Sequence, residues 1–362
     1  MDLKIWEVAT WEAKRYQGFF RNRSVQKGTK FKNDWQRTAK VVTMWSVSVK
    51  LKRRQATATE NLAAAKDVMM AEMKAMAPTY NTIIYPHVAP SLESFAVELF
   101  APDPHHGKLA WAPETGSNWD SNLSESVYGM AIDHLMARAR DLPISLIYLP
   151  LANDFFHTDT PNNTTTAGTQ MDTDTRWKKT FKRMREMIVR KVEQLRTIAP
   201  VKIVIVPGNH DETKMFYLGD ALECRFCNCP DVQVDNTPPL RKYDQFGITL
   251  LGWAHGDKEK ALNYPMLMAH EAKAMFAQSR YYEWHLGHLH TRKENTRAIA
   301  DQVNTDTIDG VVIRRIPSLC GTDFWHHGKG YAHSPRQADM YLWSDQRAYA
   351  GHFSYSYFGE KG

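Results

Sequence analysis

The sequence predicts an α/β fold. Short apolar runs typical of buried strands alternate with longer stretches in which apolar residues recur at helical spacing. Five of the strand-like runs are followed at once by clusters of Asp, Asn and His, and ligands gather at the carboxyl ends of strands in α/β proteins. These observations indicate an α/β domain whose functional residues follow its strands.

The N-terminal part of the chain differs in composition from the rest. Residues 1–55 contain 14 Lys or Arg and 4 Asp or Glu, a net charge of +10, whereas the whole chain has +6. Aromatic residues such as Trp11 and Trp45 interleave with these cations. Lys and Arg can neutralise phosphates and aromatic rings can stack on bases, so this composition favours nucleic-acid binding. The alternative is a small helical unit whose aromatic residues form its core and whose cations are solvated. We expect a basic, mainly helical appendage over residues 1–78 that binds nucleic acid or forms oligomers.

A linker and a catalytic domain are expected to follow this appendage. The Ala- and Met-rich residues 56–76 are typical of a helix, and Pro78 ends that pattern. Pro86, Pro90 and Ser91 then mark irregular chain. We therefore place a linker at residues 79–92 and the catalytic domain at residues 93–362.

Within the catalytic domain, strands and helices are expected in alternation. Strands are predicted at residues 95–100, 144–151, 201–206, 248–254 and 284–286. Helical stripes span residues 123–135 and 177–195, and three later strand-like runs at 310–316, 339–343 and 350–357 are expected to complete a second sheet. The second helix carries seven Lys or Arg, which we interpret as a solvated face, with a track for a polyanion as the alternative.

Residues 158–175 form a polar segment directly after one of the polar clusters. They are rich in Thr, Asn and Asp and contain almost no apolar residue. Such a segment cannot bury itself, so we expect an exposed, mobile loop. Its position favours a lid or substrate loop, and a disordered insertion is the alternative.

The most informative motif is Pro207-Gly208-Asn209-His210-Asp211, which follows the apolar residues 201–206. Asn and His side chains are ligands suited to a divalent metal of intermediate softness, whereas a turn followed by a helix cap would be the purely structural interpretation. The other four clusters are Asp103-Pro104-His105-His106-Gly107, Asn153-Asp154-Phe155-Phe156-His157, His255-Gly256-Asp257 and Gly287-His288-Leu289-His290.

This ordered set resembles the calcineurin-like metallophosphoesterases, whose pattern is DxH, GDxxD, GNH(D/E), HG and GHxH. The resemblance covers residues 94–290 and implies a four-layer α/β/β/α sandwich with two mixed sheets. It also implies two metal sites. The first would be held by Asp103, His105, Asp154 and His290, and the second by Asp154, Asn209, His255 and His288. Asp154 would bridge the metals, and His210 would stabilise or protonate the leaving group.

The implied chemistry is hydrolysis of a phosphate ester. Two cations roughly 3.5–4 Å apart neutralise the phosphate oxygens and hold the attacking water between them. Mixed nitrogen and oxygen ligands favour manganese, iron or zinc over an all-oxygen magnesium cage. We expect two divalent metal ions, with manganese first and iron, zinc, nickel or magnesium as alternatives.

The second motif departs from the family pattern, and this departure bears on the substrate. His157 stands where many members have the last Asp of GDxxD, which resembles the DNA double-strand-break-repair nuclease branch. We expect His157 to serve catalysis, a loop histidine being the alternative, in a DNA nuclease of the kind that tailed phages carry. A phosphomonoesterase, a small-molecule or cyclic-nucleotide phosphodiesterase, and a non-catalytic nucleic-acid-binding or scaffold protein remain open.

A segment near the C-terminus mixes aromatic, polar and basic residues. We expect Thr322, Trp325 and Arg336 to contact the substrate, with a plain surface loop as the alternative.

Composition fits an intracellular enzyme. Hydrophobic residues make up 43% of the chain, the mean hydropathy is −0.51, and no apolar run approaches the ~20 residues that span a membrane. The charged N-terminus lacks an apolar signal core. We expect a cytoplasmic protein without a membrane partner, acting in a bacterial host if phage-encoded. Cys224, Cys227 and Cys229 are interpreted as reduced thiols, with a zinc site as the alternative.

Overall fold

The chain forms two compact units, Met1–Ala71 and Glu72–Gly362. The computed structural model describes residues 6–20, 40–53, 68, 78–85, 93–288, 304–322 and 336–358. Within these ranges, no helix combines the length and the apolar character needed to cross a lipid bilayer.

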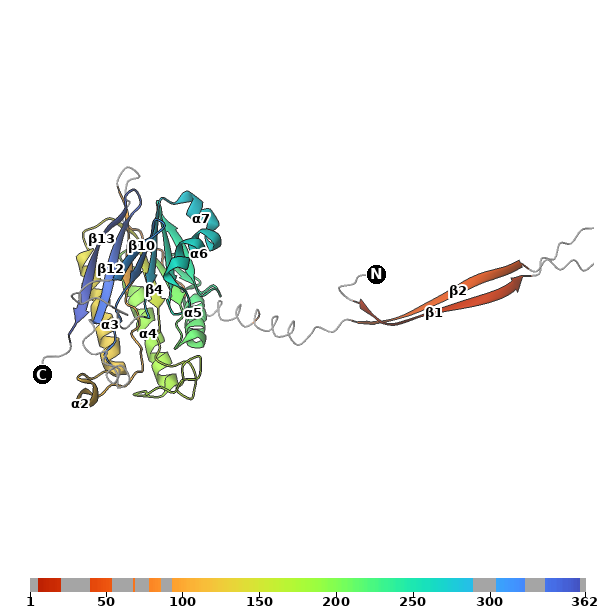
Figure 1. Cartoon of the computed structure of the whole chain (residues 1–362), viewed down its shortest axis with the longest axis horizontal. Helices are drawn as coiled ribbons and strands as arrows, with labels where there is room; N and C mark the ends of the chain where they lie inside the picture. Colours follow the sequence, from red (N-terminus) through yellow and green to blue (C-terminus); the bar gives the residue numbers. More distant parts are fainter. Residues whose placement is uncertain are drawn as a thin grey trace, which may run out of the picture. The chain divides into compact units, whose positions relative to one another are not determined.

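The first unit contains a two-stranded antiparallel ribbon (Figure 1). Strand β1 (Trp6–Phe20) pairs with β2 (Lys40–Arg53) from Trp6↔Arg53 to Phe20↔Lys40. The expectation of a mainly helical appendage is therefore wrong for these residues. Apolar and polar residues alternate over residues 10–14 and 45–52, and this period of two is that of a strand. The helix expected at residues 56–76 lies outside the described residues, apart from Val68.

The second unit contains a six-stranded mixed sheet. Its strands, in spatial order, are β13 (Ala348–Tyr357), β12 (Arg336–Ser344), β3 (Phe95–Phe100), β4 (Ile144–Ala152), β5 (Val201–Val206) and β6 (Val232–Asp235). The four strands from β3 to β6 run parallel, whereas β12 and β13 are antiparallel to their neighbours. The central parallel strands are almost wholly buried, as their continuous apolar sequence predicts.

A five-stranded mixed sheet lies against the first. Its strands, in spatial order, are β10 (Asn304–Ile308), β11 (Val311–Arg315), β9 (Tyr281–Leu286), β8 (Thr249–Ala254) and β7 (Lys242–Phe246). Strands β11, β9 and β8 run parallel, and the two edge strands are antiparallel. The predicted α/β class with two mixed sheets is therefore confirmed.

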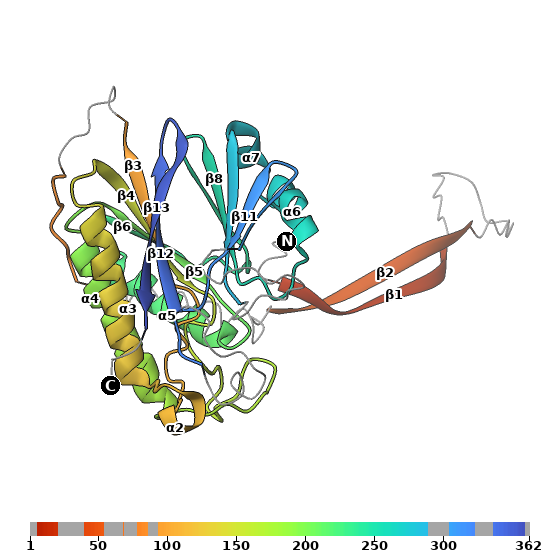
Figure 2. The same ribbon diagram turned by 60° about the vertical axis from the view of Figure 1, so that its left-hand side comes forward.

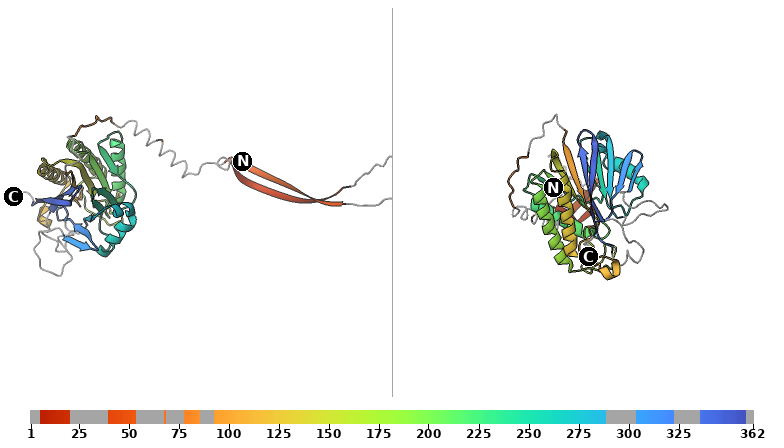
Figure 3. Two further views of the ribbon diagram at one scale, coloured as in Figure 1. Left: turned by 90° about the horizontal axis from the view of Figure 1, so that it is seen from above. Right: turned by 90° about the vertical axis from the view of Figure 1, so that its left-hand side faces the viewer.

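Helices cover the outer face of each sheet, so the unit has four layers (Figure 2). The six-stranded sheet carries α3 (Ser121–Arg138), α4 (Trp177–Leu195) and α5 (Glu212–Phe226), and the five-stranded sheet carries α6 (Tyr264–Glu271) and α7 (Lys273–Gln278). Two short elements, α2 (Ala112–Thr115) and η1 (Ala261–Asn263), lie in connections. Figure 3 shows from another side how the two sheets stack between the helices.

Three apolar clusters hold the layers together. One fills the space between the six-stranded sheet and α3, α4 and α5, and includes Val127, Ile188 and Leu218. The second lies between the sheets around Trp253 and Trp343, and the third lies under α6. The helical stripes predicted at residues 123–135 and 177–195 are thus core faces of α3 and α4.

The C-terminal strands differ from the sequence-based expectation. Residues 310–316 do form β11 of the second sheet, but β12 and β13 join the first sheet, where Met340 pairs with Leu99 of β3. The expectation that all three strands complete the second sheet is therefore wrong. An alternating or continuous apolar pattern identifies a strand, but both sheets offer apolar neighbours, so the pattern does not choose between them.

The described part of the expected linker, residues 78–85, belongs to the second unit and packs against α4 and α5. The Tyr80 ring lies 5.7 Å from the Phe226 ring, and the Tyr80 hydroxyl donates to Glu193 of α4 over 3.2 Å. The Tyr85 hydroxyl donates to the carbonyl of Arg196 over 2.6 Å. Residues 78–85 are thus anchored at the C-terminal end of α4.

Candidate metal centre

The predicted metal ligands lie directly after the carboxyl ends of five strands. Asp103 follows β3, Asp154 follows β4, Asn209 follows β5, and His255 and His288 follow β8 and β9. Backbone hydrogen bonds continue beyond the strands: the Asp103 N–H donates to the Asn153 carbonyl over 2.8 Å, and the Gly287 N–H donates to the His255 carbonyl over 3.2 Å. The loops of both sheets therefore meet at the carboxyl ends of their parallel strands.

Backbone strain is concentrated in these loops. Of the eight non-glycine residues with positive φ among the described residues, five lie at the site: Asp103, His105, Asn153, Asp154 and His288. Their φ values lie between 45° and 66°, the left-handed region that disfavours most side chains. Such strain persists only where the surrounding structure enforces it, and it clusters at functional sites.

Two groups of potential metal ligands share one carboxylate. Ligand atoms of Asp103, His105 and Asp154 lie within 4.8 Å of one another, and so do those of Asp154, His255 and His288. The side chain of Asn209 joins the second group, because its Oδ1 lies 2.8 Å from Nε2 of His255. Six of the seven predicted metal ligands are thus brought together, and the seventh, His290, lies outside the described residues.

The contacts around His255 fit a cation. Its Nε2 lies 2.8 Å from Oδ1 of Asn209, 3.0 Å from Nδ1 of His288 and 3.4 Å from Oδ2 of Asp154. An imidazole nitrogen carries at most one proton, which can satisfy only one of these neighbouring lone pairs. A divalent cation accepts lone pairs from all of them, so these residues could hold a metal ion.

Two buried polar atoms at the site support this interpretation. Oδ1 of Asp103 and Nδ1 of His255 have no hydrogen-bond partner among the described residues. A buried polar atom without a partner costs free energy, and at a natural site it calls for an explanation such as a bound ion.

Burial sets the protonation of the ligands in the metal-free chain. It raises the pKa of Asp103 and of Asp154 well above the usual range of a carboxyl, and it lowers the pKa of His255 and of His288. The imidazoles are therefore held neutral, as metal ligands must be. The carboxylates can be held ionised by a bound cation, whose charge opposes the effect of burial.

Gly208 allows a close approach that any other residue would block. A Cβ atom at this position would lie 2.0 Å from Oδ1 of Asp154. The turn after β5 can therefore lie directly on the shared carboxylate only because it contains glycine.

His210 lies beside both ligand groups. Its backbone N–H donates to Oδ1 of Asp154 over 2.8 Å, and its Nδ1 lies 2.9 Å from the carbonyl of His157, which can only accept a proton. Nδ1 therefore carries a proton, which it donates to this carbonyl. The rings of His105 and His210 lie 4.9 Å apart.

His157 belongs to the same cluster of imidazoles. Its Nδ1 lies 3.2 Å from Nδ1 of His105, and its ring stacks on that of His210 at 5.5 Å. Ligand atoms of all three histidines lie within 4.8 Å of one another. His157 is buried at the site and is not a loop histidine in solvent.

Asp211 has a positioning role that the sequence analysis missed. Its carboxylate accepts from the Gly208 N–H over 2.9 Å and from the Phe156 N–H over 2.8 Å. Burial raises the pKa of Asp211 to about 7. The carboxylate joins the turn after β5 to the loop after β4, and only the tertiary structure brings Phe156 within reach.

The polar loop at residues 158–175 is anchored at its start and near its middle, contrary to the expectation of an exposed loop. Thr158 and Asp159 are buried, and the Asp159 carboxylate accepts from the Lys214 N–H over 2.9 Å and the Thr213 N–H over 3.2 Å. The Thr166 N–H donates to the Asn209 carbonyl over 3.2 Å. Polar side chains here satisfy the first turn of α5, which composition alone does not reveal.

Two of the three predicted substrate contacts, Thr322 and Arg336, belong to the described residues. Arg336 hydrogen-bonds Ser117, and its guanidinium lies 5.9 Å from the Tyr357 ring centroid. Thr322 is half-buried and follows Gly321, whose carbonyl accepts from Lys108 over 2.8 Å. Trp325 lies outside the described residues.

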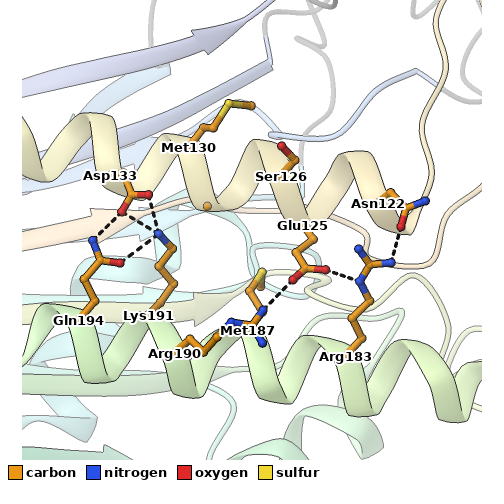
Figure 4. A pocket seen from close by; sticks show the side chains of 11 residues that line it. Asn122, Glu125, Ser126, Met130, Asp133, Arg183, Met187, Arg190, Lys191 and Gln194 are labelled. Carbon is orange, nitrogen blue, oxygen red and sulfur yellow. Dashed lines mark hydrogen bonds and ion pairs between the residues drawn. The ribbon is translucent and has the colours of Figure 1, made fainter.

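Three of the cations predicted on α4 form ion pairs with α3 (Figure 4). Arg183 and Arg190 pair with Glu125, and Lys191 pairs with Asp133. These pairs neutralise that part of the helix surface, so it is not a continuous track for a polyanion.

The cysteine cluster takes no part in the candidate metal site. None of Cys224, Cys227 and Cys229 belongs to a group of potential metal ligands within the described ranges.

Comparisons with known proteins find similar chains among the solved structures. No family model matches the chain. No curated protein matches it either. Among solved structures, it is similar to the crystal structure of a conserved uncharacterized protein of Streptococcus pneumoniae, described as a predicted phosphoesterase. The identity is 12%, the match covers 73% of this chain and 98% of the other, and the TM-score is 0.26.

Proposed function

We propose that this chain is a metal-dependent phosphoesterase that hydrolyses phosphodiester bonds in DNA. The observation that carries the proposal is the position of Asp154, whose carboxylate belongs to both groups of potential ligands. Two nearby cations repel each other, and a shared negative ligand offsets that repulsion. A carboxylate of this kind has little purpose in a site for one metal.

We assign the residues to the two metals as the resemblance to the metallophosphoesterases implies. Asp103, His105 and Asp154, with His290, would hold one divalent ion, and Asp154, Asn209, His255 and His288 would hold the other. The mixed nitrogen and oxygen ligands favour manganese, with iron, zinc, nickel and magnesium as alternatives. When bound, the metals supply positive charge that neutralises phosphate oxygens and activates the attacking water.

His210 is proposed to act on the leaving oxygen. The carbonyl of His157 holds the proton on Nδ1 of His210, so a second proton on Nε2 makes an imidazolium that can donate it. The hydrogen bond from the His210 backbone to Asp154 fixes the ring beside the ligands. His157 is proposed to support this arrangement through its carbonyl and its stacked ring.

The choice of DNA rests on His157 and on the basic N-terminal segment. His157 occupies the position that the DNA-repair branch of the resembled family fills with histidine, and residues 1–55 carry a net charge of +10. The ion pairs between α3 and α4 remove part of the charge that would otherwise favour the same substrate.

An activity panel tests the proposal. Single-stranded DNA, duplex DNA, bis-p-nitrophenyl phosphate and p-nitrophenyl phosphate are each incubated with the full chain and manganese. We expect hydrolysis of DNA and of the bis ester, slow reaction of the monoester, and loss of all activity in Asp154→Asn prepared in parallel. Rapid monoester hydrolysis with intact DNA would contradict the substrate, and no hydrolysis in the panel would contradict the enzyme class.

A further inference from the structure

The β1–β2 ribbon has two unlike faces. Side chains of directly opposed residues project to the same side, and the side alternates along each strand. One face carries the pairs Trp11↔Val49, Ala13↔Val47 and Arg15↔Trp45, and the other carries Thr10↔Lys50, Glu12↔Ser48 and Lys14↔Ser46. Contacts agree with this assignment, because the Arg15 guanidinium lies over the Trp45 ring and Lys14 pairs with Glu12. The ribbon is therefore amphipathic between Val8 and Arg15, whereas nearer the Phe20↔Lys40 end Tyr16, Val42 and Met44 lie on the other face and are exposed as well.

A β-bulge extends the apolar face to the end of the ribbon. The register shifts between Val8 and Thr10, so Ala9 is an extra residue and Val8 lies opposite Leu51. Without the shift, Val8 would face Lys52 on the polar side. The bulge thus keeps Val8 and Leu51 in line with Val49 and Val47.

This apolar face is exposed within the described residues. Trp11 is 70% exposed, Trp45 66% and Val47 63%. Trp6, Val8, Val49 and Leu51 are exposed as well. The three indoles alone leave on the order of 400 Å² accessible, and the four aliphatic side chains add to it. The total approaches the ~800 Å² per partner that a standard protein interface buries.

Of the four Lys and Arg of the ribbon whose side chains the structure describes, Lys14, Arg15 and Lys52 contact a partner, and Lys50 lies on the polar face opposite Thr10. On the polar face, Lys14 pairs with Glu12 at 3.1 Å and Lys52 with Glu7 at 2.9 Å. Between Val8 and Gln17, Arg15 is the one charged residue of β1 on the apolar face, and it lies over Trp45 at 6.0 Å. The apolar face thus lacks the unpaired cations that a nucleic-acid surface presents, and aliphatic side chains such as Val47 do not stack on bases, so any contact of the basic segment with DNA would use other residues.

We propose that the apolar face of the ribbon binds the same face of a second copy of this chain. An isolated two-stranded hairpin is marginally stable in water, and it gains stability when its apolar face is covered. A second copy supplies an identical, mostly apolar face, on which Arg15 lies over Trp45, so a two-fold interface is self-complementary. The two ribbons would pack face to face as two sheet layers. This inference does not depend on the proposed phosphoesterase activity.

Sedimentation equilibrium of the full chain tests the proposal. We expect a mass of twice 41.6 kDa at about 50 µM. Val47→Glu places a charge in the apolar face and should weaken dimerisation at least about tenfold. Ser46→Glu is the matched control, because it adds the same charge to the adjacent residue on the polar face, opposite Lys14. It should remain dimeric, and both variants should hydrolyse bis-p-nitrophenyl phosphate like the wild type.

Two results would overturn the proposal. A monomeric wild-type chain at this concentration would do so whatever the variants show, even if Val47→Glu disturbed the ribbon. A dimer that survives Val47→Glu would place the interface elsewhere. If the wild type is monomeric and Val47→Glu instead weakens DNA binding, the face serves nucleic acid and the proposal is wrong.

Discussion

The backbone N–H of His210 donates to Oδ1 of Asp154 over 2.8 Å. The residue proposed to act on the leaving oxygen is thus joined directly to the carboxylate proposed to bridge the metals. The two roles remain separable, because the hydrogen bond uses the backbone of His210 and not its ring. Substitution of the ring therefore leaves this bond in place.

Removal of the His210 ring should separate metal binding from chemistry. We expect His210→Ala to keep its metal content and to lose about 10²-fold or more in kcat, since a general acid typically contributes this much. The surface histidine variant His270→Ala, on α6, is the control and should behave like the wild type. If His210→Ala loses metal and excess manganese restores its activity, His210 is a ligand and the proposed role is wrong.

A single methyl group at Gly208 should disrupt the site. A Cβ at this position would meet Oδ1 of Asp154 at 2.0 Å, so Gly208→Ala must displace either the turn or the shared carboxylate. We expect weaker manganese binding by calorimetry. Gly129→Ala on α3 is the control, because its Cβ would meet its nearest neighbour, on Lys191, at an ordinary 3.6 Å. Equal manganese affinity in both variants would show that the close approach is unimportant.

Asp211 should matter for stability because one carboxylate serves two loops. It accepts from the N–H groups of Gly208 and Phe156, and the NH₂ group of an asparagine cannot accept the second of these bonds. Asp211→Asn should lower the free energy of unfolding by about 1–3 kcal/mol, measured by urea denaturation. The exposed Asp141→Asn should change it little. If Asp211→Asn leaves the free energy of unfolding unchanged, the two hydrogen bonds of Asp211 do not stabilise the fold as proposed.

His285 should make stability depend on pH. It is buried between the two sheets, where its ring nitrogens lie 2.7 Å from Glu98 and 2.9 Å from Glu283, and Glu283 also pairs with Arg314. Burial lowers the pKa of His285, but the charges and hydrogen bonds of Glu98 and Glu283 outweigh it and raise the pKa to about 9.

The folded state therefore binds the His285 proton more tightly than the unfolded state does. Its contribution to stability is fully present below pH 6.5, the ordinary pKa, and is lost as the pH rises through about 9. Urea denaturation at pH 7 and pH 10 should show this loss in the wild type. His285→Gln should cost about 3–5 kcal/mol at pH 7 and lose less than the wild type between the two pH values. If the wild type and His285→Gln lose the same free energy of unfolding between pH 7 and pH 10, His285 is not the source of the pH dependence.

Local patterns in the sequence predicted much of the second unit. The mostly apolar residues 95–100 and 201–206 coincide with β3 and β5, because a short apolar run rich in β-branched and aromatic residues is typical of a buried strand. The residues from Trp177 to Leu195 coincide with α4, because apolar residues at helical spacing form one buried face of a helix. The polar residues that follow the strands could be placed together because parallel strands end at one edge of a sheet.

Features that depend on distant partners were not predictable in this way. Asp211 acquires its role only when the fold brings Phe156 to it, and β12 could have joined either sheet. The ribbon was misjudged because the alternation of Trp11 and Ala13 with charged residues was interpreted as a mixture of aromatic and basic residues and not as two faces of a strand.

The metal content of Asp154→Asn tests the central claim most directly. The wild-type chain and this variant are saturated with manganese, freed of unbound metal and analysed by elemental mass spectrometry, with Asp141→Asn as the control. The proposed bridging role predicts about two ions per wild-type and control chain and loss of both in Asp154→Asn, because the shared charge holds the two cations together. Full occupancy in Asp154→Asn would contradict a metal site built around Asp154.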